Sequence, residues 1–182
     1  MDRARALEEL KLRLENDENL KHSLAAEAIM RKLAEYFRED VELWGIAGLV
    51  HDIDLERIQY DISQSGIMGG DILEALDFDP TIIYAVRSRN PKSRHQRRRK
   101  IDKAIYCAPP MSVLISACMN IQPDKKIENV DEALVLSMFH DNSFAPEADR
   151  KKIAACSELN LSLEEFIKIS LEAMKEISDK LN

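Results

Sequence analysis

The 182-residue chain has little glycine and proline, with 5 and 6 residues respectively. Sheets of many short strands need frequent turns, and glycine and proline are the residues that most often form them. Their scarcity therefore disfavours a β-sandwich or β-barrel. Leu, Ala, Ile, Glu and Lys dominate instead, a combination that favours helices.

Cysteine is also scarce and unpatterned. Cys107, Cys118 and Cys156 form an odd set without C-x-x-C spacing, so that neither a disulfide framework nor a cysteine zinc site is implied. The longest apolar run is too short to span a bilayer, and the charged start "MDRARALEELKLRLEN" cannot be the apolar part of a secretory signal. We therefore expect a reduced, cytoplasmic setting.

Excess positive charge is missing as well. The net charge of −7 predicts no general attraction to nucleic acid or to an anionic membrane. No phosphate-binding loop, dinucleotide fingerprint or nucleophile elbow occurs. These absences exclude several large enzyme classes and leave the function to be sought in other side chains.

The chain does have nearly continuous helical periodicity, and no segment alternates with a period of two. We predict an all-α fold of eight to ten helices, a compact bundle that forms a single domain over residues 1–182. One helix is expected from about Leu20 to Phe37, and Asp40, Asp79 and Ser162 are expected to cap others. Pro109 and Pro110 are expected to end a short helix.

Two histidines share the inward faces of their helices. His22 lies four residues before Ala26, and His51 lies seven after Trp44 and is followed by Asp52. Two imidazoles and a carboxylate can therefore converge, and such ligands suit Mn, Fe, Co, Ni or Zn. Asp54 is a candidate catalytic residue, which could hold a ligand or a water or take the place of a missing ligand. The competing hypothesis is an ordinary buried histidine at a helix end.

A family resemblance supports the metal hypothesis. It rests on five segments in order, "LKHSLAAEAIMRKLA", "LWGIAGLVHDIDLER", "SGIMGGDIL", "DKAIYCAPPMSVLISA" and "FAPEADRKKI". Over about residues 20–175 the chain resembles the HD-domain superfamily of metal-dependent phosphohydrolases, in its small single-domain prokaryotic branch. The resemblance implies an all-helical bundle and a divalent metal (Mn, Fe, Co, Ni, Zn or Mg) held by His22, His51, Asp52 and a distant aspartate.

The chain departs from the family pattern at three positions. Pro109 stands where the distant aspartate is expected, Ser65 replaces a histidine before the glycine of "GIMGG", and Arg89 replaces another histidine. The lost histidines would help to bind a second metal or the substrate phosphate. The resemblance therefore implies a degenerate metal site that binds its metal ion weakly or not at all. Arg89 places a permanent positive charge near it.

Three functional hypotheses follow. The first is a phosphohydrolase of the HD superfamily with a degenerate metal site and weak or lost activity. The second is a working mononuclear phosphohydrolase acting on a nucleotide or another small phosphorylated molecule. The third is a non-enzymatic anion-binding or regulatory module that uses the basic segment, residues 87–103, with Arg87 and Arg89 as anion ligands.

Overall fold

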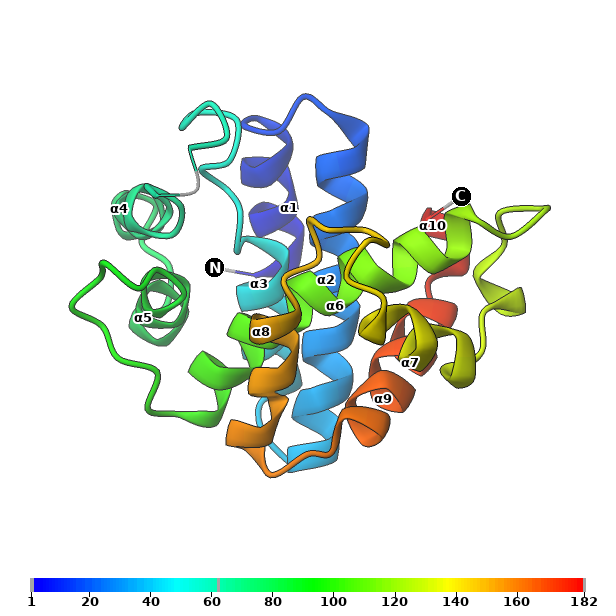
Figure 1. Ribbon diagram of the computed structural model, residues 1–182. Helices are drawn as coiled ribbons and strands as arrows, with labels where there is room; N and C mark the ends of the chain where they lie inside the picture. Colours follow the sequence, from blue (N-terminus) through cyan, green and yellow to red (C-terminus); the bar gives the residue numbers. More distant parts are fainter. Residues whose placement is uncertain (1, 62, 182) are drawn as a thin grey trace.

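Two helices of 21 residues form the centre of the molecule, α2 (Asp17–Phe37) and α6 (Lys100–Asn120). The computed structural model describes residues 2–61 and 63–181. In Figure 1, α6 crosses α2, and α2 also packs against α3 and α9. Each of the two central helices has a continuous buried stripe, so that their packing forms the middle of the hydrophobic core.

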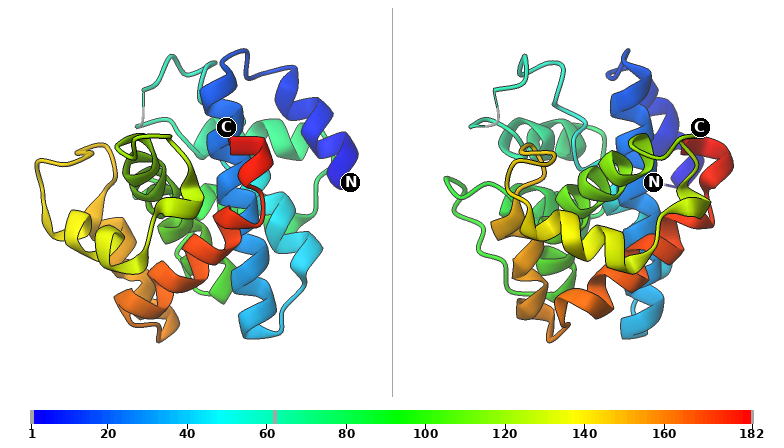
Figure 2. Two further views of the ribbon diagram at one scale, coloured as in Figure 1. Left: turned by 90° about the vertical axis from the view of Figure 1, so that its right-hand side faces the viewer. Right: turned by 45° about the vertical axis from the view of Figure 1, so that its right-hand side comes forward.

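Shorter elements surround this pair. Figure 1 shows α4 and α5 on one side, and Figure 2 looks onto the opposite side, where α7, α9 and α10 lie. Their bounds are α1 (Arg3–Lys11), α3 (Val41–Leu49), α4 (Ile67–Ala75), α5 (Pro80–Ser88), η1 (Ile127–Asn129), α7 (Glu132–His140), α8 (Arg150–Ala154), η2 (Ala155–Leu159), α9 (Leu163–Lys175) and α10 (Ser178–Leu181). The described residues contain ten α-helices and no strand, which confirms the all-α prediction.

The predicted helix caps are present. Asp40 accepts a hydrogen bond from the Leu43 N–H at 2.9 Å, and Asp79 accepts one from the Thr81 N–H at 2.7 Å. Ser162 forms a reciprocal capping box with Glu165 at the start of α9. Each cap satisfies backbone donors that a helix leaves unpaired at its N-terminus, which is why short sequence patterns predicted these starts.

The predicted helix end at Pro109 and Pro110 is wrong. Both prolines lie inside α6, which continues to Asn120. Each proline removes one backbone hydrogen bond, but α6 packs along its length against α2, α5, α7, α8 and α9. This tertiary packing outweighs the local cost, and it cannot be seen in the local sequence.

Close contact between α2 and α3 depends on Gly48. A Cβ atom at this position would lie 2.8 Å from the Ala26 carbonyl oxygen and 2.9 Å from the Met30 Cγ. Only glycine therefore allows the end of α3 to approach α2 this closely. This approach brings the turn after α3 onto α2.

Glycine has a different role before α4. Gly66 has a φ of +80° and precedes α4 as its N-cap, whereas Gly69 and Gly70 lie inside the first turns of that helix. Gly66 therefore marks the break before α4. None of the helices in the described residues is long and apolar enough to cross a membrane. The cytoplasmic setting and the single-domain organisation stay predictions.

Candidate metal centre

His22, His51 and Asp52 come together as predicted. The helix α3 ends at Leu49, and His51 and Asp52 lie in the turn that follows, both buried. His22 projects from the second turn of α2, and its side chain is 23% exposed. The His51 Nε2 atom lies 3.2 Å from the His22 Nε2 and 3.1 Å from the Asp52 Oδ2. The third side of this triangle, from His22 Nε2 to Asp52 Oδ2, measures 3.6 Å.

Hydrogen bonds fix the tautomers of both imidazoles. The His51 Nδ1 lies 2.7 Å from the Gly48 carbonyl oxygen, which can only accept, so Nδ1 carries the proton. Ser112 donates its hydroxyl to the Pro109 carbonyl at 2.8 Å and accepts from the His22 Nδ1 at 3.1 Å. Both Nε2 atoms are therefore bare lone pairs in the neutral rings, and two lone pairs facing each other repel unless a cation lies between them.

The three donors fit a divalent metal ion. They are the one group among the described residues in which three His, Cys, Asp or Glu ligand atoms lie within 4.8 Å of one another. Nitrogen and oxygen ligands about 2.1 Å from a common ion are separated by about 3.0 Å in octahedral and about 3.4 Å in tetrahedral geometry. Two of the observed separations, 3.1 and 3.2 Å, lie within this range, and the third, 3.6 Å, exceeds the tetrahedral value by about 0.2 Å.

The electrostatics of the cluster favour ligands that are ready to bind. Burial, together with the neighbouring His51, lowers the pKa of His22 from 6.5 to about 4. Burial by itself would raise the pKa of Asp52, but His51 and Arg89 outweigh it and hold that pKa well below its usual range. Near neutral pH the cluster thus presents a neutral His22 imidazole and the Asp52 carboxylate, the protonation states in which these two groups bind a metal ion.

Arg89 contacts the other side of the same carboxylate. Its Nη1 donates to the Asp52 Oδ1 at 3.0 Å and to the His51 carbonyl oxygen at 2.5 Å. The side chains of Arg89 and Asp52 are 16% and 13% exposed, so this ion pair is largely shielded from water. The predicted positive charge near the site is therefore present, but it leaves Oδ2 free to face the histidines.

Asp54 lies outside the cluster. Its Oδ2 accepts hydrogen bonds from the backbone N–H groups of Gly66 and Gly69, at 2.8 and 2.7 Å, and its buried Oδ1 has no partner among the described residues. Burial raises its pKa, and the two backbone N–H groups oppose that rise. The structure gives Asp54 a role in holding the start of α4, and its proposed catalytic role stays a prediction.

The other predicted positions are engaged elsewhere. Arg87 donates to Asp71 and Glu74 of α4, at 2.6 and 2.7 Å, so that its anion-binding role stays a prediction. The buried Pro109 contributes only its carbonyl, to Ser112. The backbone carbonyl of Ser65 accepts a hydrogen bond from the Asn90 side chain at 2.8 Å.

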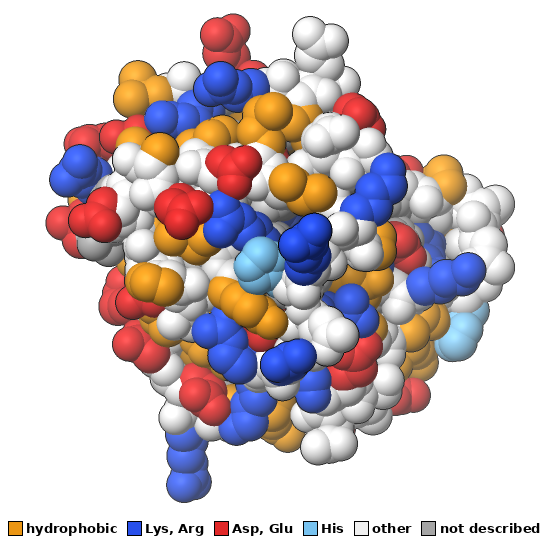
Figure 3. All heavy atoms as spheres, turned by 90° about the vertical axis from the view of Figure 1, so that its left-hand side faces the viewer, with side chains coloured by type: hydrophobic (Ala, Val, Ile, Leu, Met, Phe, Trp, Pro, Cys, Tyr) orange, Lys and Arg blue, Asp and Glu red, His pale blue; other side chains and the backbone are white. Residues whose placement is uncertain are grey.

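The basic segment covers the face that includes α5 and the loop after it. Figure 3 looks onto this side of the molecule and shows Lys and Arg side chains interspersed with carboxylates. Arg97 pairs with Glu158 and stacks on Tyr106, and Arg99 pairs with Asp102. Much of the charge of this segment is thus used within the fold, and its binding of an external anion stays a prediction.

Sequence analysis missed Ser112 and Lys152. Ser112 is 90 residues from the His22 that it orients, and no local pattern marks it. Lys152 of α8 makes no ion pair among the described residues. Burial and the nearby Arg89 lower the pKa of Lys152, and the carboxylate of Asp52 acts in the opposite direction. The basic pattern "DRKK" is the signal that could have drawn attention to it.

One family model, that of the HD domain, matches residues 19–108. The match contains His22, His51 and Asp52, which form the cluster described above. The chain belongs to the HD-domain superfamily. No curated protein and no solved structure matches it. The HD-domain match implies the metal-dependent phosphohydrolase superfamily, and it ends one residue before Pro109.

Proposed function

We propose that this HD-domain protein binds one divalent metal ion through His22, His51 and Asp52 and is a weak phosphohydrolase of a small phosphorylated molecule. The supporting observation is the pair of unprotonated Nε2 atoms that face each other beside the Asp52 Oδ2. Imidazole nitrogen and carboxylate oxygen accept Mn, Fe, Co, Ni, Zn or Mg, with the softer ions favoured by the two nitrogens.

Each residue of the centre has a separate task. Ser112 and the Gly48 carbonyl hold the two imidazoles in the tautomer that exposes Nε2. Arg89 uses only Nη1 within the described residues, which leaves Nη2 and Nε to hold a phosphate oxygen. A bound ion would supply positive charge to the phosphate and lower the pKa of an attacking water.

Weak activity is proposed because the ligand set is small. Pro109 offers no side-chain ligand, and neither Ser65 nor Arg89 supplies the imidazole that the family resemblance implies at its position. The centre thus has three protein ligands. The guanidinium of Arg89 stands where the family resemblance implies a further imidazole. Charge neutralisation of the phosphate then depends on one ion and on Arg89.

Metal analysis and hydrolysis assays test this proposal together. We expect the purified protein to bind a divalent ion with a dissociation constant that His51→Ala raises at least tenfold, and to hydrolyse phosphomonoesters slowly. His140→Ala is the matched control, since His140 is exposed at the end of α7. Unchanged metal binding in His51→Ala would contradict the metal site, and ordinary enzymatic turnover in the wild-type protein would contradict weak activity.

A further inference from the structure

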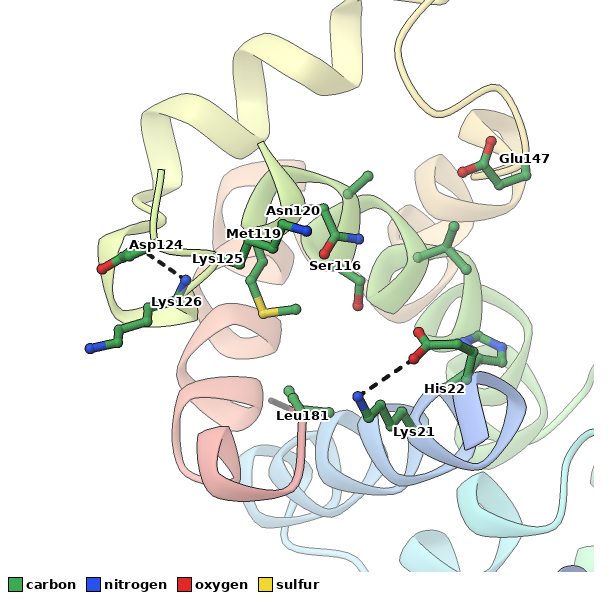
Figure 4. Close-up of a pocket in the computed structure, with 13 residues that line it drawn as sticks. Lys21, His22, Ser116, Met119, Asn120, Asp124, Lys125, Lys126, Glu147 and Leu181 are labelled. Atoms are coloured by element: carbon green, nitrogen blue, oxygen red, sulfur yellow. Dashed lines mark hydrogen bonds and ion pairs between the residues drawn. The ribbon is translucent and has the colours of Figure 1, made fainter. Parts of the chain in front are cut away.

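A cavity of about 740 Å³ adjoins the metal centre at His22. It lies between the start of α2, the second half of α6 and the turn at residues 124–126 (Figure 4). Its volume is within the range of pockets that hold small organic ligands, about 300–1,000 Å³, and far exceeds what a phosphate needs.

Polar side chains connect the metal centre to the cavity along α6. Ser112, Ser116 and Asn120 are spaced by four residues, so that they share one face of the helix over about 12 Å. Ser112 orients His22, whereas Ser116 and Asn120 line the cavity. The side chains of these last two have no hydrogen-bond partner among the described residues. They are therefore free to bind the polar edge of a ligand.

The rest of the lining combines apolar surface with balanced charge. Met119 and Leu181 point toward the cavity in Figure 4, and Val113 adds to this apolar wall. The charged lining residues number three of each sign, namely Lys21, Lys125, Lys126, Glu18, Asp124 and Glu147. The Lys21 and Glu18 side chains lie 3.5 Å apart. A lining of zero net charge favours an uncharged group, and its three carboxylates would repel a second phosphate.

We propose that this cavity binds the uncharged body of the phosphomonoester, and that Ser116 and Asn120 select a body with hydroxyl or amide groups. The inference rests on the proposed function, since the phosphate is assigned to the metal centre. A nucleoside has the required size, apolar faces and hydrogen-bonding edges. A body that carries its own phosphate is disfavoured.

Binding measurements on the full chain test the proposal. With metal present, we expect adenosine or cytidine 5′-monophosphate to bind at least about tenfold more tightly than methyl phosphate, because the body adds contacts worth about 1.4 kcal/mol or more. The 3′,5′-bisphosphates should bind less tightly than the 5′-monophosphates. Equal affinity for a monophosphate and methyl phosphate would overturn the proposal.

Two variants of α6 probe the cavity itself. Ala117→Trp fills the cavity and should lower the affinity for a nucleotide to the affinity for methyl phosphate. The affinity for the metal ion should stay unchanged. The matched control is Ala75→Trp, at the exposed end of α4. Asn120→Ala, at an exposed position, avoids any folding defect and should weaken nucleotide binding about threefold to tenfold. Wild-type nucleotide affinity in both variants would overturn the proposal.

The two proposals fail in different ways. If the protein bound neither metal nor methyl phosphate, the proposed function would be wrong. Phosphate-free adenosine should nevertheless shift the amide NMR signals of Ser116 and Asn120, which would support the cavity as a binding site. No shift with adenosine or cytidine would overturn the cavity proposal, whatever the metal titration shows.

Discussion

The Nε2 atoms of His22 and His51 face each other at 3.2 Å with no hydrogen available between them in the neutral rings. Their Nδ1 atoms hold the protons, against Ser112 and the Gly48 carbonyl. This arrangement is unfavourable for two isolated neutral imidazoles and favourable for a pair that shares a cation. We therefore expect metal binding to stabilise the folded chain.

Removing Ser112 should weaken metal binding without removing a ligand. In Ser112→Ala the His22 ring loses the acceptor that keeps its proton on Nδ1, and a loss of about tenfold in metal affinity is expected. Calorimetric titration with Mn²⁺ or Co²⁺ measures it. Ser116→Ala, one turn further along α6, is the matched control, and equal affinity in the two variants would contradict the orienting role.

Restoring a carboxylate at position 109 should strengthen the site. Pro109 is one turn before Ser112 on the face of α6 that meets His22, so Pro109→Asp should raise metal affinity at least about tenfold and raise the rate of hydrolysis. Pro110→Asp also restores a backbone N–H but points about 100° away around the helix. A gain in both variants would show a helix effect and would refute the role of a fourth ligand.

Arg89 should weaken the binding of a metal ion and strengthen the binding of phosphate. Arg89→Met removes the cation beside Asp52, so we expect tighter binding of a divalent ion and weaker binding of methyl phosphate. Titrations at two salt concentrations separate these effects. Arg87→Met is the control, because Arg87 pairs with Asp71 and Glu74, and it should change neither affinity.

Acid should destabilise the metal-free protein. The pKa of His22 is lowered from 6.5 to about 4, so between these values the unfolded chain binds more protons than the folded one. The free energy of unfolding therefore falls as the pH drops from 6.5 toward 4, by about 3 kcal/mol at most. Urea unfolding in a chelator measures it. His22→Asn should flatten this slope, and a slope unchanged by the variant would contradict the assignment to His22.

The two glycines of α3 should respond differently to substitution. In Gly48→Ala the new Cβ meets the Ala26 backbone, and we expect a loss of about 1–3 kcal/mol in the free energy of unfolding together with weaker metal binding. In Gly45→Ala it meets the flexible Arg31 side chain, which can move, so stability should change little. Thermal unfolding compares them, and equal losses would contradict the close approach at Gly48.

Local sequence signals predicted the parts of the fold that local forces control. Side-chain oxygens at Asp40, Asp79 and Ser162 cap helices because their acceptors lie within three residues of the donors. Apolar spacing placed His22 on the buried face of its helix. The prediction at Pro109 failed because a helix packed against several neighbours retains its form despite two missing backbone bonds.

The sequence by itself determined an all-helical HD domain and three of its metal-binding side chains, because periodicity, caps and the His51–Asp52 pair are encoded over a few residues. Tertiary structure alone decided which oxygen of Asp52 pairs with Arg89, which hydroxyl orients His22 and where the cavity beside it lies. The first two relations join residues 37 and 90 positions apart. They depend on how the helices pack, and no local pattern specifies that packing.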